Sequence, residues 1–410
     1  MKINKSNTTI TFFLFINPLL GFLLSLFSLR KENFKFFIIT ASFFVFCITL
    51  YTPPYQDLYR KYISTYYVYN QNTTLLEALK GQVDFLFYTN SWLLFKLSLP
   101  FYLIPAIYSS LSMYLTLSAA KDFWVLNAAE CRRNTFLICV LCVFSFVDFI
   151  MIASTLRFGF AVSLILKGIT SFYIKDRKKT AIILFILSVT CHMSMLLVVV
   201  AIFCSSYIKI SRLTCGITSV IVYSTSIYIF PFILNSIHLG ILNEYITNGY
   251  LNTDYANISE NINTLLVQSS KWFMLLVFFI FYYKQGTASK EFDNFVRLLI
   301  ILSCTTALSV TMFNRYFNGL LLPLIVISAL SKLLVIEKSK FFKVFIIFIF
   351  IFNTFVVNIF LERRQLIMGE MWRGLYTPVF FIIIYNMDDF NSYLKDIDSD
   401  GNWVKNRLAN

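Results

Sequence analysis

The sequence is poor in charge and in glycine. Charged residues make up 14% of its 410 residues, against about a quarter in an average soluble domain, while 58% are hydrophobic and 46 are Phe. An apolar surplus of this size has to face lipid, so the composition predicts a single all-α integral membrane domain over residues 1–410. With only 12 glycines, close helix contacts are scarce, which favours a fixed scaffold over a rocking transporter.

Several catalytic motifs are also missing. The chain has no Walker loop, no HExxH, no GxSxG and no DxD-like run in a soluble domain. Without a nucleotide-binding domain, an activated donor would have to reach the outer face already attached to lipid. Most of the eight cysteines lie within apolar runs, and Cys139 and Cys142 form a CxxC by spacing alone. We therefore expect no metal and no cofactor.

The net charge of +14 is divided among short basic clusters between apolar runs, which indicates positive-inside topology and not nucleic-acid binding. Six clusters can all be cytoplasmic: Arg30–Lys35, Lys121–Arg133, Lys175–Lys179, Lys209–Arg212, Lys284–Lys290 and Lys332–Lys343. The expected spans are then 10–29, 36–52, 100–120, 135–153, 158–174, 180–191, 193–208, 213–235, 271–284, 295–313, 316–331 and 344–360. With a candidate at 374–386, and 84–98 unassigned, the protein is expected to be polytopic with about 12–13 transmembrane helices.

One apolar stretch, residues 180–206, decides how the second half of the chain is threaded. As one long span it would place Lys209 and Arg212 outside. Two short spans that turn near His192 keep both inside and place His192 at the outer surface. The positive-inside bias favours the second arrangement.

Two polar segments then lie outside the membrane. The first, 53–83, begins with two prolines, where a helix cannot simply continue. Tyrosines recur here at steps of three or four, which places them on one face of a helix: Tyr51, Tyr55, Tyr59, Tyr62, Tyr66 and Tyr69. Such a stripe suits the aromatic belt of a membrane interface, and a platform for stacking sugars is the alternative. The second, the large loop 236–270, is rich in Asn and Tyr, and is either a flexible lid or a glycan-binding lid.

Four residues that could carry chemistry fall on this outer side: Asp57, Arg157, His192 and Arg315. Each Arg lies where one span ends and the next begins, so it could merely reach the interface, or the pair could hold a diphosphate through planar guanidinium donors. His192 is either a hydrogen-bonded turn residue or a general base. Asp57 could accept a proton, bind a sugar hydroxyl or pair with a neighbouring basic residue.

Asp148 is expected in the outer half of the 135–153 span. Carboxylates at that depth are rare and need a partner. The sequence leaves two states open for it, pairing with Arg157 or protonation.

Four motifs stand in order along the chain: Asp57-Leu-Tyr59, Arg157-Phe-Gly-Phe-Ala161, Val189-Thr-Cys-His192-Met-Ser-Met195, and Asn314-Arg315-Tyr316 before a span with Pro323. In their order, spacing and shared side they resemble the EpsG/Wzy-type polymerases of bacterial O-antigen and exopolysaccharide. The likeness covers most of the chain. It departs from the family at Met193–Met195, where the family often has a basic residue or Pro and then Ser-Ala.

The resemblance implies a GT-C-like glycosyltransferase in the bacterial inner membrane, with its active site facing the periplasm. Undecaprenyl-diphosphate-linked oligosaccharide would be both donor and acceptor, and a chain-length regulator protein and membrane lipid are further expected partners. It implies that Arg157 and Arg315 bind the diphosphate and that His192 or Asp57 activates the acceptor hydroxyl. Asp148 and Tyr59 are expected to bind substrate.

Two other functions fit the sequence less well. A lipid-linked oligosaccharide flippase would need charged residues along a central cavity and two related halves, whereas the polar residues here gather at one face. An O-antigen ligase usually carries its key Arg and His in the large outer loop, and the loop 236–270 has His238 but no Arg.

Overall fold

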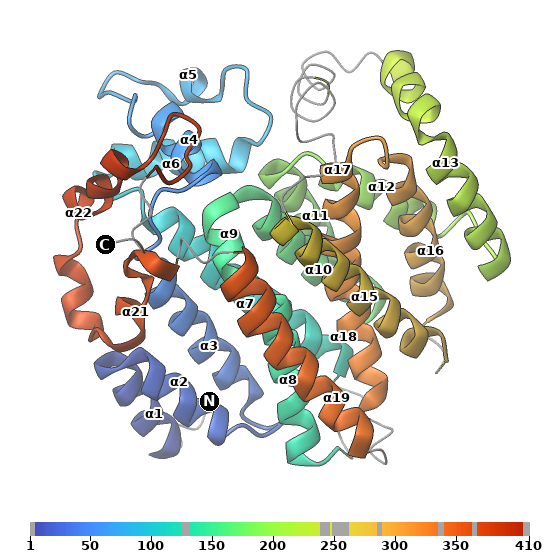
Figure 1. Ribbon diagram of the computed structural model, residues 1–410, viewed down its shortest axis with the longest axis horizontal. Coiled ribbons are helices and arrows are strands. Elements are labelled where there is room, and N and C mark those ends of the chain that lie inside the picture. Colours follow the sequence, from blue (N-terminus) through green and yellow to red (C-terminus); the bar gives the residue numbers. More distant parts are fainter. Residues whose placement is uncertain are drawn as a thin grey trace.

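The computed structural model describes residues 5–124, 131–237, 247, 262–284, 289–334, 340–362 and 367–404. In these ranges the chain is helical or irregular, and its β-structure is limited to one bridge between Ile397 and Trp403. The predicted all-α fold is therefore confirmed for the described part of the chain, whose helices pack into one bundle (Figure 1).

The helices of the first half follow one another closely. They are α1 (Lys5–Ile16), α2 (Pro18–Phe27), α3 (Phe34–Thr49), α4 (Asp57–Ser64), α5 (Leu75–Leu79), α6 (Phe85–Lys96), α7 (Leu103–Trp124), α8 (Arg133–Phe146), α9 (Phe149–Thr155), α10 (Arg157–Tyr173), α11 (Lys178–Cys191) and α12 (Met195–Cys204).

The second half contains α-helices, 3₁₀ turns and π-helical stretches. They are α13 (Arg212–Ile237), α15 (Ile262–Lys284), α16 (Lys290–Thr305), α17 (Val310–Asn314), η4 (Arg315–Leu321), α18 (Leu322–Leu333), α19 (Lys340–Ile351), η5 (Phe352–Glu362), η6 (Ile367–Met371), α21 (Arg373–Tyr376), η7 (Val379–Ile384), α22 (Met387–Asn391) and η8 (Ser392–Asp396). Of these, η4, η5 and η6 are π-helical.

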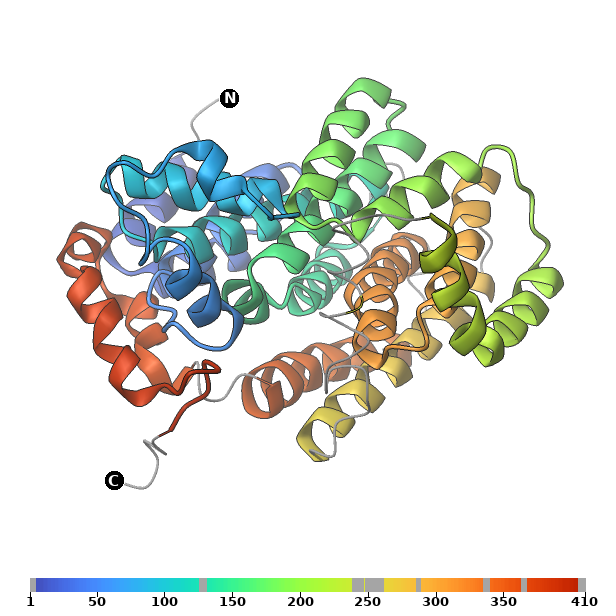
Figure 2. The ribbon, with the colours of Figure 1, turned by 90° about the horizontal axis from the view of Figure 1, so that it is seen from above.

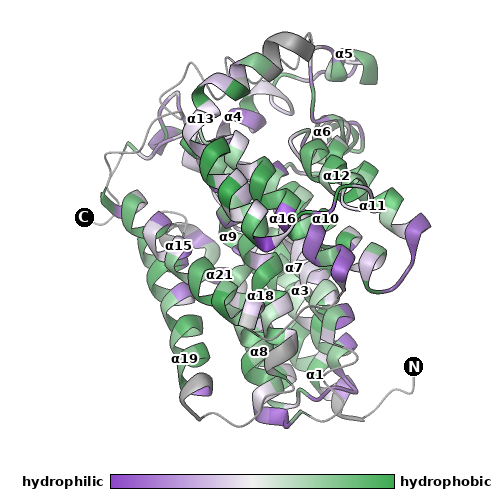
Figure 3. Cartoon of the chain, turned by 90° about the vertical axis from the view of Figure 1, so that its right-hand side faces the viewer, coloured by the Kyte–Doolittle hydropathy of each residue, from purple (hydrophilic) through white to green (hydrophobic). Residues whose placement is uncertain are grey.

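Five helical segments within the described ranges are long and apolar enough to cross a membrane, which needs about 20 residues. They are Leu103–Trp124, Arg133–Thr155, Ile262–Tyr283, Val310–Ser331 and Lys343–Leu361. Shorter apolar helices pack beside them, as α3 does against α7. Figure 3 shows α19 hydrophobic over most of its length. The chain is thus a multi-pass membrane protein.

Most expected spans coincide with helices. The spans 36–52, 100–120, 158–174, 180–191, 193–208 and 213–235 match α3, α7, α10, α11, α12 and α13, and the span 344–360 matches α19 with η5.

The expected span 10–29 is wrong as a single helix. The chain breaks at Asn17, whose side chain caps α2 by accepting from the backbone N–H of Leu20, and Pro18 occupies the first turn, where its missing N–H costs nothing. The two short helices pack tightly, because a Cβ added at Gly21 would lie 2.3 Å from the Cα of Leu14.

The boundary expected between spans 295–313 and 316–331 is also wrong. The break falls earlier, after Thr305, where hydroxyl side chains bond to their own backbone: Thr306 Oγ1 donates to Ser303 O at 2.8 Å. The next helix begins at Val310 and runs through η4 into α18. Arg315 therefore lies inside a continuous helical segment and not at its start.

Two further segments do not form spans of their own. Residues 374–386 contain α21, Pro378 and the 3₁₀ turn η7, so the thirteenth span is wrong as one helix, because a proline interrupts it. Residues 84–98 form α6, whose 12 residues are about 18 Å long and shorter than the hydrocarbon core.

Much of the loop 236–270 lies outside the described residues, namely 238–246 and 248–261. Its last part is helical, because α15 begins at Ile262 and not near residue 271. Lys271 therefore lies in the middle of the candidate membrane span Ile262–Tyr283. The expected span, 271–284, had placed Lys271 at its first residue.

The C-terminal segment packs onto the polar segment 53–83, and Figure 2 shows the two side by side. Tyr62 donates to Asn391 Oδ1 at 2.8 Å, and the ring of Tyr55 stacks on Trp403. Three of the tyrosines in the predicted stripe, Tyr51, Tyr55 and Tyr62, are buried. For these three the interpretation as an exposed belt or sugar platform is wrong, because they hold the C-terminal segment in place.

Basic clusters that were expected on one side do approach one another. Arg133 Nε donates to Leu29 O at 3.1 Å, which joins the first two clusters. The guanidinium of Arg212 lies 5.1 Å from the centre of the Tyr283 ring, at the end of α15. This arrangement agrees with a shared face for those clusters.

Candidate active site

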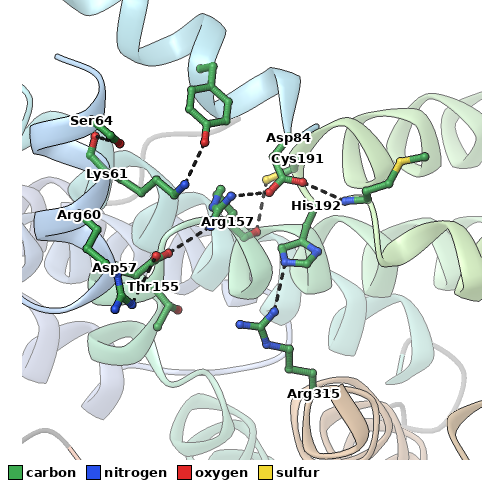
Figure 4. A network of polar contacts seen from close by, with 12 residues as sticks. Asp57, Arg60, Lys61, Ser64, Asp84, Thr155, Arg157, Cys191, His192 and Arg315 are labelled. Carbon is green, nitrogen blue, oxygen red and sulfur yellow. Dashed lines mark hydrogen bonds and ion pairs between the residues drawn. The ribbon is translucent and has the colours of Figure 1, made fainter. Parts of the chain in front are cut away.

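A cavity of about 480 Å³ lies between α4, α8, α9, α10, α15, η4, α18 and η5. Its wall includes Asp57, Arg157, His192 and Arg315, the four residues predicted to carry chemistry, and also Asp148. Figure 4 shows the four within one network of polar contacts. Four distant parts of the sequence thus meet at one place, as the expected threading requires.

Arg157, the first residue of α10, is held between two carboxylates. Its Nη1 donates to Asp84 Oδ2 at 2.5 Å, and its Nη2 donates to Asp57 Oδ2 at 3.4 Å. The side chain is 12% exposed and that of Asp84 only 1%, so both charges depend on this pairing. Asp84 Oδ1 also accepts from the N–H of Met193 at 3.1 Å, which links Arg157 to the turn that carries His192.

Asp84 was not predicted as a site residue. It lies just past the polar segment 53–83 and precedes α6, which the threading left unassigned. The single sequence indication was an acidic residue beside an apolar run, and many surface residues share that pattern.

The residues that precede Asp57 and Arg157 have strained backbones. Gln56 has φ 49° and ψ −118°, and Leu156 has φ 57° and ψ −76°. A positive φ is uncommon for residues with a Cβ and is found where surrounding contacts enforce it, often at functional sites. The N–H of Gln56 donates to Gly401 O at 2.7 Å, and a Cβ at Gly401 would lie 2.7 Å from Gln56 O. The C-terminal segment thus contributes to the position of Asp57.

His192 lies in the turn between α11, which ends at Cys191, and α12, which begins at Met195. The predicted helix break is present, and His192 is only 2% exposed, so the residue is buried within the bundle at this turn. Its position on the outer side of the membrane stays a prediction. His192 lines the cavity because Asp84 draws the following residue, Met193, inward.

Both ring nitrogens of His192 contact groups that can donate. Arg315 Nη1 lies 3.4 Å from Nε2, Ser194 Oγ lies 2.7 Å from Nδ1, and the backbone N–H of Ser194 points to Nδ1 at 3.4 Å. A guanidinium has only donors, so Nε2 can accept from Arg315. Burial lowers the pKa of His192 to about 3; the Asp84 carboxylate opposes this shift, and the cationic Arg side chains add to it. The imidazole is therefore neutral near pH 7.

Arg315 is placed by a close contact between η4 and α10. Its guanidinium lies 5.3 Å from the centre of the Phe158 ring, and the same ring meets His192 edge to face. Gly319, one turn further along η4, permits this, because a Cβ there would lie 2.6 Å from Phe158 Cε1.

Asp57 is the first residue of α4. It pairs with Arg60 at 3.8 Å, the local pairing that the sequence allowed, and also with Arg157. Burial tends to raise the pKa of Asp57, but positive charge, chiefly that of Arg157, outweighs it and holds the pKa below its usual value. Burial and the nearby Arg157 lower the pKa of Lys61 to about 8, and its Nζ donates to Tyr88 at 2.9 Å.

Pairing with Arg157 was one of the two states left open for Asp148, and the structure places Lys271 beside it instead. Its Oδ2 lies 3.9 Å from Nζ of Lys271, and its Oδ1 accepts from the N–H of Met151 at 3.0 Å, which caps α9. Helix α9 separates Asp148 from Arg157, so this alternative is wrong in its partner. Tyr59 is half-buried on α4 and is not part of the cavity wall.

Within the ranges described above, no group of three or more His, Cys, Asp or Glu side chains has an arrangement that could hold a metal ion.

Together, the fold and the site define a multi-pass membrane protein with a polar cavity lined by cationic side chains and a neutral histidine. The family model of the EpsG family matches residues 36–368, and the chain belongs to that family. Comparisons with curated proteins and with solved structures give no match. The GT-C-like relationship therefore stays a prediction.

Proposed function

We propose that this EpsG family protein is a polysaccharide polymerase. It moves the growing glycan from its undecaprenyl diphosphate carrier to a hydroxyl of the next lipid-linked repeat unit, at the periplasmic face of the bacterial inner membrane. The observation that carries the proposal is the meeting of Arg157, His192 and Arg315 at one cavity in a membrane-embedded bundle. Family membership supports it.

The leaving group sets the first requirement. The bond between the anomeric carbon and the diphosphate oxygen breaks, and its electron pair leaves with undecaprenyl diphosphate, so negative charge grows on phosphate oxygens. Arg315 suits this role better than Arg157, whose guanidinium is already engaged by Asp84 and Asp57. Arg157 then acts as a positioning residue that fixes the turn of His192.

The acceptor hydroxyl sets the second requirement. Its oxygen forms the new bond to the anomeric carbon, and its proton passes to Nε2 of His192. In this structure Nε2 faces Arg315. When Arg315 turns toward a diphosphate, Nε2 is released, and the nearby anion favours the protonated ring. Binding of the donor thus prepares the base.

The test compares Arg315→Lys with wild type on a ladder gel of surface polysaccharide. Lys keeps the charge and loses the planar fork, so most polymer should disappear while the protein still accumulates in the membrane. Arg373→Lys is the matched control, because Arg373 pairs with Glu370 at 3.0 Å outside the cavity, and it should give a normal ladder.

A normal ladder from Arg315→Lys would contradict the proposed role of the guanidinium. Deletion of the gene separates the other functions. A single repeat on the lipid core indicates a lost polymerase, whereas no repeat at all indicates a lost ligase or flippase.

A further inference from the structure

A second polar cluster, made of Asp148, Lys271, Asn353 and Asn358, lies in the wall of the same cavity. All four residues belong to segments that are long and apolar enough to cross a membrane. Polar and charged groups at that depth are costly and mark functional sites. The proposed reaction at Arg315 and His192 uses none of them.

The two Asn side chains are brought together by a π-helical stretch. Asn353 and Asn358 both belong to η5, and five positions on an α-helix would place them about 140° apart. The wider π turn lets Nδ2 of both donate to one acceptor, the backbone oxygen of Ser145, at 2.7 and 3.0 Å. Both amides are therefore oriented by a fixed carbonyl.

The charged pair is fixed in a similar way, and both of its residues line the cavity. Asp148 caps α9, and Lys271 faces it at 3.9 Å. Their side chains are 17% and 19% exposed. The Asp148 carboxylate can accept hydrogen bonds from hydroxyl groups, the Lys271 ammonium can donate to them, and the amides of the two Asn side chains can do both. Together, the carboxylate and the ammonium carry no net charge. This donor and acceptor set suits an uncharged, polyhydroxylated ligand.

We propose that the second polar cluster binds uncharged sugar rings of the lipid-linked glycan while Arg315 holds its diphosphate; this rests on the proposed function. Asp148 and Arg157 lie at opposite ends of the seven-residue helix α9, which is about 10 Å long. Arg157 positions the turn of His192, and His192 contacts Arg315, so the cluster begins about one length of α9 away from this group of residues. A ligand that extends from the diphosphate into the cavity would meet the two groups in turn.

Binding to the purified protein in detergent tests this with two probes. One is undecaprenyl diphosphate, and the other is the undecaprenyl-diphosphate-linked oligosaccharide that accumulates in a strain without this gene. Lys271→Met and Asn358→Ala should each weaken binding of the glycan-bearing lipid about tenfold, the effect of one lost hydrogen bond, and leave binding of the bare lipid unchanged. Arg315→Lys should weaken both.

A matched control exists elsewhere in the bundle. Lys167 pairs with Asp122 at 2.5 Å, with side-chain exposures of 18% and 16%, but lies outside the cavity wall. Lys167→Met removes the same kind of partly buried charge and should bind both probes as wild type does. If Asn358→Ala does not accumulate in the membrane, Lys271→Met decides the matter alone.

Two results would overturn the inference. The first is a Lys271→Met protein that binds the glycan-bearing lipid as tightly as wild type does. The second is a Lys271→Met protein that loses the same affinity for both probes. Failure of the proposed function is different, because the wild-type protein would then bind neither probe and the Arg315→Lys ladder would be normal.

Discussion

His192 is held at both ring nitrogens, by Arg315 at Nε2 and by Ser194 at Nδ1. Its surroundings keep the ring neutral, which leaves a lone pair on the nitrogen that faces the cavity. A turn histidine that only stabilises the fold would need the same hydrogen bonds, so the two roles have to be separated by a variant that keeps the bonds and loses the basicity.

His192→Gln is that variant. Glutamine can accept from Arg315 and donate to Ser194, so the protein should accumulate normally, but it cannot take a proton near pH 7. Loss of a general base typically costs about 10²–10⁴ in rate, so the ladder should shrink to single or very short repeats. A normal ladder would assign His192 a purely structural role.

Stability against pH gives a second measurement for the same variant. The pKa of His192 is lowered from 6.5 to about 3, so the folded protein binds this proton more weakly than the unfolded chain does. Stability should therefore fall as pH drops from about 6.5 toward 3, by up to about 1.4 kcal/mol per pH unit. His192→Gln should remove this slope, measured as unfolding temperature in detergent at about pH 7 and about pH 5.

At the scale of elements, hydrophobic runs predicted most helices, and charge placement predicted the break at His192. The sequence did not predict the π-helical stretches η4 and η5, because their wider turns depend on packing and not on residue pattern. It placed Arg315 at a helix start because it did not predict the break after Thr305. Lys271 and Asp84 were not predicted as site residues, because their partners, Asp148 and Arg157, are distant in the sequence and meet them only in the folded chain.

Gly319→Ala tests the packing that positions Arg315. The added Cβ would push the Phe158 ring away from its contacts with His192 and Arg315. A misplacement of about 1 Å can cost about a hundredfold in rate, so polymer length and amount should drop sharply while membrane insertion stays normal. The ladder gel measures the first and an immunoblot the second.

Gly216→Ala is the control for this substitution. Gly216 lies in α13 with nothing near its would-be Cβ, so Ala should be neutral or stabilise the helix by up to about 1 kcal/mol. Equal ladders from both variants would mean that the contact with Phe158 does not position the site.

At the scale of the whole molecule, the contacts of the C-terminal segment restrict the topology. This segment follows the residues matched by the family model and packs onto residues 53–83. Both therefore lie on one side of the membrane, which agrees with an even number of crossings between them.

Reporter fusions check this arrangement. Fusions after Asn70 and after Val404 should both read periplasmic, and a fusion after Lys179, in a basic cluster, should read cytoplasmic. A cytoplasmic result at Asn70 would place Asp57 and the cavity on the wrong face for a lipid-linked glycan. Opposite results at Asn70 and Val404 would contradict the packing of the two segments.

The hydrogen bond between Gln56 and Gly401 joins residues made at very different times during synthesis. The strained backbone that precedes Asp57 gains this support only after the ribosome has added residue 401, when the membrane helices have already been translated. Until then, a nascent chain in the membrane lacks this support for the position of Asp57.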